Sequence, residues 1–270
     1  MTASDKKTAE KTQEVISVCK AHGANAFIAL AGVPGSGKSF IALQAAQQLA
    51  TQKEMVTEIQ FSPSWSYEEF IEGMRLGEGG KVEYVRGLFL EVNRAANADP
   101  KSIYVLLIEE LTRANLAAVL GELLTFIEYR DRPFTTIYQR QKVTVAKNLT
   151  IIGTYNPTDR SAIEMDGALM RRLRIISFPP SVQQLQEMLA AGKVDAEIIK
   201  KLVALFEECK KARPDDWHQA MPFGHGIFAG VKTEEDLKSL WHERIIHFLR
   251  RPLLEPHPMT DVIEKNYPWK

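Results

Sequence analysis

The chain has 270 residues, 45% of them hydrophobic, which is enough for one full α/β domain and a smaller second one. Its 34 basic and 34 acidic residues cancel, so the net charge gives no argument for a nucleic-acid or acidic-membrane partner. The first residues lack the apolar core of a signal peptide, and no apolar run is long enough to cross a bilayer, which predicts a cytoplasmic protein. Cys19 and Cys209 lack metal-ligand spacing and are expected to be buried free thiols.

The first strong signal follows a predicted helix at residues 4–22 and a short apolar strand at 26–31. It is Gly32-Val33-Pro34-Gly35-Ser36-Gly37-Lys38-Ser39, a G-x-x-x-x-G-K-S motif, and a run rich in helix formers starts directly after it at Phe40. A strand before the motif and a helix after it are the context of a phosphate-binding P-loop rather than of a glycine-rich turn that binds nothing.

The residue types of the motif fit phosphate chemistry. Glycines let successive N–H groups turn toward phosphate oxygens, and the helix start adds the positive end of its dipole. Lys38 can reach the β- and γ-phosphates, and the Ser39 hydroxyl can ligate Mg²⁺. The candidate nucleotide-binding residues are Gly32, Val33, Pro34, Gly35, Ser36, Gly37, Lys38, Ser39 and Phe40.

The segment after the P-loop helix predicts a strand at 56–61 and a helix whose start is marked by its sequence. Ser66 and Glu69 form a capping box, and Trp65 and Phe70 can pack as its hydrophobic staple. Residues 76–85 are glycine-rich and are expected to form a loop or a short hairpin. Residues 87–98 predict a helix, which the following Asp-Pro pair ends.

Two adjacent acids end the next strand. Residues 103–108 form a continuous apolar run, as expected for a central strand of a parallel sheet, and Glu109 and Glu110 follow it. Many strands end in solvated charges. Downstream of a P-loop, however, one carboxylate at this position can hold the Mg²⁺ shell and the other can act as general base toward the attacking water.

A helix with a buried apolar stripe and a basic hairpin come next. Leu116, Leu120, Leu123 and Ile127 recur at helical spacing and predict core positions. Residues 129–147 carry five basic residues against one acid, and their alternation predicts an inserted β-hairpin. Two interpretations stay open for this hairpin: a pore or partner-contact loop, and a solvated surface hairpin.

The next strand, 149–155, delivers Asn156 to the same sheet edge as the two glutamates, where its amide can contact the γ-phosphate or the attacking water. Ser161 and Glu164 are expected to cap the following helix. That helix ends in Arg171, Arg172 and Arg174. One of these arginines could stabilise the transferring phosphoryl group across a subunit interface, or the cluster could be an intramolecular ion-pair network.

The second half of the chain predicts a small helical domain. Pro179 and Pro180 break the chain, and Ser181 with Gln184 caps a new helix. Amphipathic helices are predicted at 196–211 and 234–249, with a glycine-punctuated loop at 221–228 between them.

Taken in order, these features resemble the AAA+ ATPases. Within that family, three segments resemble the McrB-type branch, the motor subunit of methyl-directed restriction systems: residues 61–70, 110–116 and 153–161. The last segment is similar to the branch signature M-N-T-A-D-R-S, and residues 224–228 with the Trp241 helix look like its lid. The resemblance extends from about residue 25 to about residue 254.

The resemblance implies an α/β P-loop fold with a parallel five-stranded sheet between helices, followed by an α-helical lid. The implied boundaries are an N-terminal extension at 1–24, the AAA+ core at 25–179 with the hairpin insertion near 129–147, the lid at 180–254 and a tail at 255–270. Only about two dozen residues precede the first strand, so a DNA-recognition domain is expected to lie in another subunit.

The resemblance also implies site roles. ATP or GTP with Mg²⁺ would be the cofactors, and Ser39 and Glu109 would lie at the metal. The catalytic set would be Glu110, Asn156 as the first sensor, and Arg171 or Arg172 as a finger reaching a neighbour's nucleotide. Asp159 and Arg160 would shape the signature loop at the subunit contact.

The implied partners are further copies of the chain, with a hexamer as the expected ring, and a nuclease effector of McrC type in an anti-phage system. DNA contact would be indirect or through the basic hairpin, and no membrane is involved. Three departures from the family pattern stand out: Glu109 where the family usually has Asp, Tyr155 and Pro157 in place of the methionine and threonine of the signature, and the short segment, expected to hold no DNA-recognition domain, before the first strand. The alternatives are a MoxR-like chaperone that remodels a protein client and a nucleotide-gated scaffold with little hydrolysis.

Overall fold

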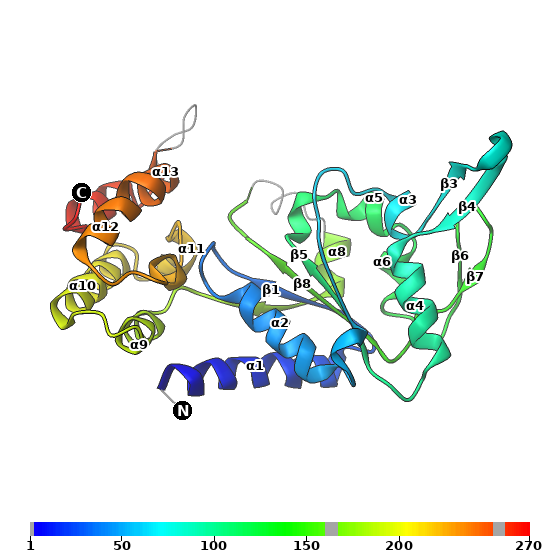
Figure 1. The fold of residues 1–270 in the computed structure, drawn as a ribbon, viewed down its shortest axis with the longest axis horizontal. Coiled ribbons are helices and arrows are strands. Elements are labelled where there is room, and N and C mark those ends of the chain that lie inside the picture. Colours follow the sequence, from blue (N-terminus) through cyan, green and yellow to red (C-terminus); the bar gives the residue numbers. More distant parts are fainter. Residues whose placement is uncertain (1–2, 160–166, 251–256) are drawn as a thin grey trace. The chain divides into compact units, whose positions relative to one another are not determined.

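The computed structural model describes residues 3–159, 167–250 and 257–270 (Figure 1). The chain divides into two compact units. The sheet unit comprises Lys11–Ala31 and Ser39–Ile176, and the helical unit comprises Met1–Glu10, Gly32–Lys38 and Ser177–Lys270. Along the described chain, no helix is both long and apolar enough to cross a membrane.

A five-stranded sheet forms the centre of the sheet unit. In their order across the sheet, the strands are β2 (Val56–Gln60), β5 (Tyr104–Glu109), β8 (Leu149–Tyr155), β1 (Phe27–Ala31) and β9 (Leu173–Ser177). β5 pairs in parallel with both β2 and β8, and β8 pairs in parallel with β1. The carboxyl ends of β5, β8 and β1 therefore lie side by side at one edge, where ligands bind in open α/β sheets. The predicted α/β fold is confirmed.

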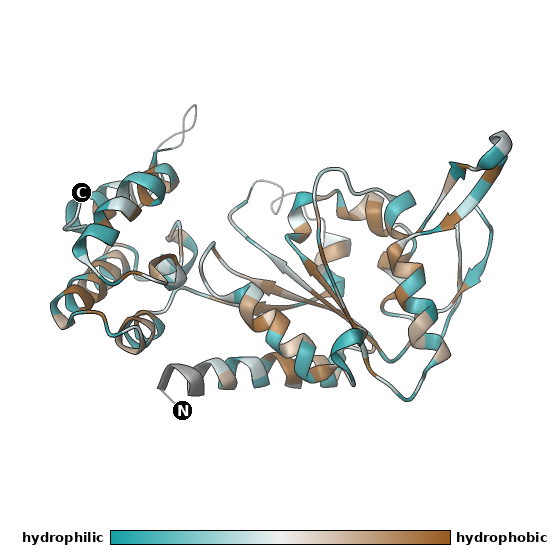
Figure 2. Ribbon diagram, in the orientation of Figure 1, coloured by the Kyte–Doolittle hydropathy of each residue, from teal (hydrophilic) through white to brown (hydrophobic). Residues whose placement is uncertain are grey.

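Both faces of the three central strands, β5, β8 and β1, are covered, which explains why these strands are mostly apolar. In β1, Phe27, Ala29 and Ala31 belong to the main core, and the intervening Ile28 and Leu30 are buried as well. In Figure 2, brown hydrophobic segments run along the central strands of the sheet unit and along helices that cover them. The described α-helices that precede β9 in the chain are α1 (Ala3–His22), α2 (Lys38–Leu49), α3 (Tyr67–Phe70), α4 (Leu88–Ala98), α5 (Leu116–Leu120), α6 (Leu123–Phe126) and α8 (Gly167–Arg172).

The helix start predicted at Ser66 is confirmed. The Ser66 and Glu69 side chains form a reciprocal capping box, with the Ser66 N–H donating to Glu69 at 3.2 Å. Trp65 and Phe70 pack edge to face with their ring centroids 6.2 Å apart. These aromatic rings therefore anchor the start of α3 in the core.

The single helix predicted through Leu116–Ile127 is interrupted. α5 ends at Leu120, the following Gly121 has φ 49°, and α6 begins at Leu123. A side chain at Gly121 would lie 2.7 Å from the Tyr67 ring, so glycine allows the close approach that bends the chain here. All four leucine and isoleucine positions of the stripe are buried, as predicted.

Two hairpins extend the sheet unit: β3 (Glu72–Leu76) with β4 (Val82–Arg86), and β6 (Phe134–Thr135) with β7 (Lys142–Val143). The first confirms the hairpin alternative at 76–85, although its strand begins earlier, at Glu72. The buried Glu72 carboxylate ties the two hairpins together, because it accepts the N–H groups of Tyr138 (2.7 Å) and Gln139 (3.0 Å).

The helical unit holds the predicted helices of the second half. They are α9 (Val182–Ala191), α10 (Ala196–Ala212), α11 (Trp217–Ala220), α12 (Glu234–Leu240), a π-helical turn (Trp241–Ile245), α13 (Ile246–Leu249) and α14 (Thr260–Asn266). The Ser181 hydroxyl accepts the Gln184 N–H at the start of α9. Near the C-terminus, Tyr267 stacks on Trp241 at 4.9 Å and donates its hydroxyl to the Leu237 carbonyl at 2.8 Å, so this end packs into the helical core.

Both cysteines are buried free thiols, as predicted. Burial disfavours the thiolate and raises the pKa of Cys19 and of Cys209 to about 12. They therefore stay protonated and unreactive at neutral pH, and they serve as small apolar side chains of the core.

Candidate active site

The backbone of the P-loop has the shape that its glycines predict. Gly35 and Gly37 have φ values of 75° and 87°, which L side chains rarely adopt. A side chain at Gly32 would lie 2.4 Å from Ser36 Oγ and 2.5 Å from the Phe178 carbonyl oxygen. The Ser36 Oγ is buried and has no hydrogen-bond partner among the described residues. The loop is therefore a crowded turn whose buried Ser36 hydroxyl can form a hydrogen bond with a ligand.

The glycine-punctuated segment at 221–228 holds the P-loop within the helical unit. The Gly224 N–H donates to the Pro34 carbonyl at 2.8 Å, and the Gly226 N–H donates to the Gly35 carbonyl at 2.7 Å. A side chain at Gly224 would lie 2.6 Å from the Gly35 carbonyl oxygen. The two glycines are therefore needed for close backbone approach, a role that the sequence pattern did not reveal.

α2 begins at Lys38, directly after the loop, and carries Ser39 and Phe40 in its first turn. The Lys38 side chain is buried, whereas the Phe40 ring is 60% exposed. Phe40 can therefore contribute its backbone N–H to nucleotide binding, whereas its ring is exposed and not packed within the protein.

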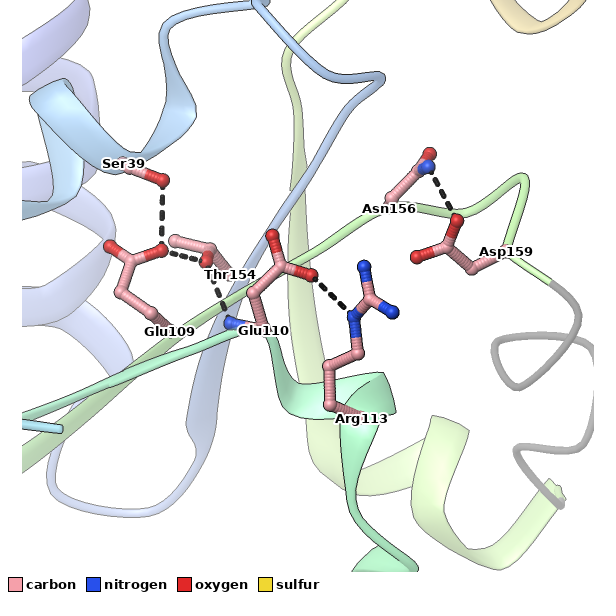
Figure 3. A network of polar contacts seen from close by, with 7 residues as sticks. All are labelled: Ser39, Glu109, Glu110, Arg113, Thr154, Asn156 and Asp159. Carbon is pink, nitrogen blue, oxygen red and sulfur yellow. Dashed lines mark hydrogen bonds and ion pairs between the residues drawn. The ribbon is translucent and has the colours of Figure 1, made fainter. Parts of the chain in front are cut away.

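A cluster of oxygen atoms joins the start of α2 to the ends of β5 and β8 (Figure 3). The Ser39 hydroxyl donates to Glu109 Oε2 at 2.8 Å, and the Thr154 hydroxyl donates to the same carboxylate oxygen. The Glu110 N–H in turn donates to Thr154 Oγ1 at 3.3 Å. The longer side chain of Glu109 thus still reaches the P-loop serine.

Thr154 is a site residue that the sequence reasoning missed. It is fully buried in β8 and connects the side chain of Glu109 with the backbone of Glu110. The available signal was a threonine near the end of a buried strand, two residues before Asn156, since a buried hydroxyl needs a partner.

Glu110 has an unusual backbone conformation. Its φ and ψ are 56° and 49°, in the left-handed region that costs a non-glycine residue energy and that recurs at functional sites. Its carboxylate lies 3.5 Å from Arg113 Nε, and 30% of the Glu110 side chain is exposed. The carboxylate is therefore accessible to a water molecule, with Arg113 as an additional neighbour that the sequence did not identify.

Asn156 lies at the tip of β8, but its amide is engaged within its own loop. The side chain is buried and donates to Asp159 at 2.8 Å, while its oxygen accepts the Thr158 N–H at 3.2 Å and the Thr158 hydroxyl at 2.9 Å. Asp159 thus holds Asn156 within this loop (Figure 3), while its expected role at a subunit contact stays a prediction. Arg160, Ser161 and Glu164 lie outside the described residues.

The two candidate finger arginines meet the same acid. Arg171 Nη2 and Arg172 Nε lie 3.4 Å and 3.3 Å from Glu128 Oε2. Arg172 also donates to the Thr125 hydroxyl at 3.4 Å. The Arg171 side chain is 65% exposed and that of Arg172 only 11%, so the intramolecular ion-pair alternative describes Arg172 well and leaves Arg171 accessible.

The basic hairpin at 129–147 contains one structural arginine. Arg130 is buried and donates to three carbonyl oxygens, of Ile127 (3.2 Å), Ala146 (2.9 Å) and Leu149 (2.5 Å). Burial lowers its pKa to about 10, which still leaves it charged at neutral pH. The other basic residues of the hairpin are exposed, namely Arg132, Arg140, Lys142 and Lys147.

Comparison with models of protein families identifies the family to which this chain belongs. The model of the AAA domain, dynein-related subfamily, matches residues 28–173, a span that includes the P-loop, both glutamates, Asn156 and both arginines. The chain belongs to this subfamily of AAA domains.

The AAA domain has a curated relative in Escherichia coli (strain K12), the type IV methyl-directed restriction enzyme EcoKMcrB subunit. The two are 30% identical over 249 residues, which cover 87% of this chain and 54% of the relative. The chain thus spans about half the length of that relative. A solved structure named as an ATPase from Cytophaga hutchinsonii aligns with TM-score 0.41 and 15% identity, over 76% of this chain and 63% of that one.

Membership of the AAA family implies nucleotide binding and, as the general class of activity, nucleoside-triphosphate hydrolysis with Mg²⁺. The residues present fit these groups. The crowded glycine turn and the orphaned Ser36 hydroxyl suit a phosphate, and the hydroxyl and carboxylate oxygens of Ser39 and Glu109 are the hard ligands that Mg²⁺ prefers.

Proposed function

We propose that this AAA domain is a nucleoside triphosphatase, using ATP or GTP, that acts in the cytoplasm as the motor subunit of a restriction-type defence system. It would assemble into a ring, expected to be a hexamer, and drive or gate a nuclease effector of McrC type. The observation that carries the enzymatic part is the contact of Ser39 and Thr154 with Glu109, directly after a P-loop. The similarity to the EcoKMcrB subunit over 87% of the chain supports the biological part.

In this proposal each group of residues has a separate role in hydrolysis. Lys38 and the P-loop N–H groups bind the phosphates, and Ser39 with Glu109 holds Mg²⁺, which would neutralise developing charge on the phosphoryl group. Glu110 accepts a proton from the attacking water, and its accessible carboxylate suits that role. Asn156 would contact the γ-phosphate or the water through its second amide N–H, or by releasing Asp159 or Thr158, since its oxygen and one N–H are engaged in its own loop.

Arg171 is the better candidate for the finger that acts on a neighbouring subunit. It is 65% exposed and shares Glu128 with Arg172, so Glu128 keeps an ion-pair partner when Arg171 leaves it. Arg172 is largely buried and also bonded to Thr125, so it would position the end of α8.

Nucleotide binding and turnover, measured with ATP and with GTP, test the enzymatic part. Lys38→Ala should abolish binding, whereas Glu110→Gln should bind nucleotide and not hydrolyse it. Wild-type turnover in Glu110→Gln would refute the catalytic assignment. Absence of hydrolysis by the wild-type chain, with and without DNA or the effector, would leave a nucleotide-gated scaffold in its place.

Mixing two inactive variants tests the finger. Glu110→Gln and Arg171→Ala are each expected to be inactive, and mixed rings should regain activity wherever an intact Glu110 faces an intact Arg171 of a neighbour. Arg172→Ala serves as the comparison. No recovery in the Glu110→Gln and Arg171→Ala mixture, under conditions where both variants co-assemble, would show that Arg171 does not act across the interface.

A further inference from the structure

A cleft of about 190 Å³ in the sheet unit lies among the end of β4, α4 and β7, and we call it the α4–β7 cleft. Arg86, Arg94 and Lys142 line it, and none of the described residues in its lining is acidic. Its other polar groups include Asn97, Gln141 and Thr144. Because the whole chain has no net charge, this group of three cations is a local feature of the fold.

The walls of the cleft are joined by hydrogen bonds from α4. Asn93 and Asn97 both donate their amide to the Thr144 carbonyl, at 3.0 Å and 3.1 Å, and the Ala146 N–H donates to Asn93 Oδ1 at 2.8 Å. On the other side, Glu72 of β3 holds the turn between β6 and β7. The cations therefore project from elements whose separation is already set, so a ligand need not order them.

The cations of the cleft are poorly neutralised by the protein. Arg94 lies 3.3 Å from Glu91, but both side chains are largely exposed, so the pair is weak. Arg86 and Lys142 form no ion pair within the described part of the chain. Glu72 stands opposite Arg86 in the β3–β4 ladder, but it is buried and its Oε1 accepts two backbone N–H groups.

We propose that the α4–β7 cleft binds a phosphate oxyanion, at a site separate from the P-loop. The guanidinium forks of Arg86 and Arg94 match the paired oxygens of a phosphate, and Lys142 adds a point charge. Two sources share this chemistry: free phosphate, and the backbone of a single nucleic-acid strand. Tyr84 is half-exposed two residues before Arg86, on the same face of β4, where its ring can stack on a base, and this favours the strand.

Arginine modification by phenylglyoxal, mapped by mass spectrometry, tests the site on the full chain. The P-loop contains no arginine, so this readout is independent of nucleotide binding there. We expect inorganic phosphate or an oligothymidylate to slow modification of Arg86 and Arg94 severalfold. Arg75, exposed on the opposite face of the same hairpin, is the internal control. Protection by the oligonucleotide alone identifies a strand as the source, and protection by both shows that free phosphate suffices.

A charge reversal gives a second measurement by fluorescence anisotropy with a labelled oligothymidylate. Arg86→Glu combined with Lys142→Glu should weaken binding and make the slope of log affinity against log salt shallower by about 0.7 for each lost phosphate contact, the value for a single strand. Lys101→Glu, an exposed lysine away from the cleft, is the matched control, and Arg86→Gln replaces the double variant if that chain does not fold. The proposal is overturned if neither probe protects Arg86 and Arg94, or if the double variant binds with the same affinity and salt slope as Lys101→Glu.

Discussion

Removing the hydroxyl of Thr154 tests whether this residue positions the carboxylate at the metal site. Thr154→Val replaces the hydroxyl with a methyl group in a fully buried position of β8. The change removes a donor to Glu109 Oε2 and the acceptor of the Glu110 N–H at 3.3 Å. Glu109 then keeps the Ser39 hydroxyl as its described hydrogen-bond donor, and its carboxylate can rotate.

The expected size of the effect follows from these two contacts. A hydrogen bond to a charged group contributes about 1.5–3 kcal/mol, and each 1.4 kcal/mol is a factor of about ten in rate or affinity. We therefore expect the turnover of Thr154→Val at limiting Mg²⁺ to fall roughly 10- to 100-fold. Higher Mg²⁺ should recover part of this loss, because the carboxylate is misplaced rather than absent.

Thr154→Ser is the matched control. It keeps the hydroxyl and loses one buried methyl group, which should lower the free energy of unfolding by about 1 kcal/mol and leave turnover nearly unchanged. Steady-state hydrolysis against Mg²⁺ concentration, together with urea unfolding of both variants, separates the two effects. If Thr154→Val shows wild-type turnover and Mg²⁺ dependence, Thr154 does not position Glu109 and the reasoning fails.

Two further predictions concern stability. Gly224→Ala should lower the free energy of unfolding by about 1–3 kcal/mol and weaken nucleotide binding, because the added methyl group would lie 2.6 Å from the Gly35 carbonyl oxygen. No described residue lies within 4 Å of a methyl group added at Gly167, so Gly167→Ala should change the stability little, and similar unfolding midpoints for the two variants would contradict this. Arg130→Met should destabilise the fold by about 3 kcal/mol or more, because three carbonyl oxygens lose a charged donor. Arg132→Met loses only an exposed cation–π contact with Tyr129 at 5.4 Å and should cost about 0.5–1 kcal/mol, and equal losses measured by urea unfolding would show that the Arg130 bonds are unimportant.

Much of the nucleotide site could be predicted from the order of residues along the chain. The P-loop, the two acids after a buried strand and Asn156 after the next one are each local patterns, and local backbone geometry follows from local residue types. The capping box at Ser66 and Glu69 was predictable for the same reason. Parallel strands then bring their tips to one edge, as found for β5, β8 and β1.

Other parts of the site depend on residues that are far apart in the sequence. Three features join segments that are distant in the sequence. They are the hydrogen bond from Thr154 to Glu109, the hydrogen bond from Gly224 to Pro34, and the cluster of Arg86, Arg94 and Lys142. No short pattern records such pairs, because they form only when the strands and helices pack. The sequence alone specified which chemical groups this protein carries at the ends of its strands. The tertiary structure determined the hydrogen-bond partners of these groups, because a buried polar group pairs with the donors and acceptors that packing brings within reach.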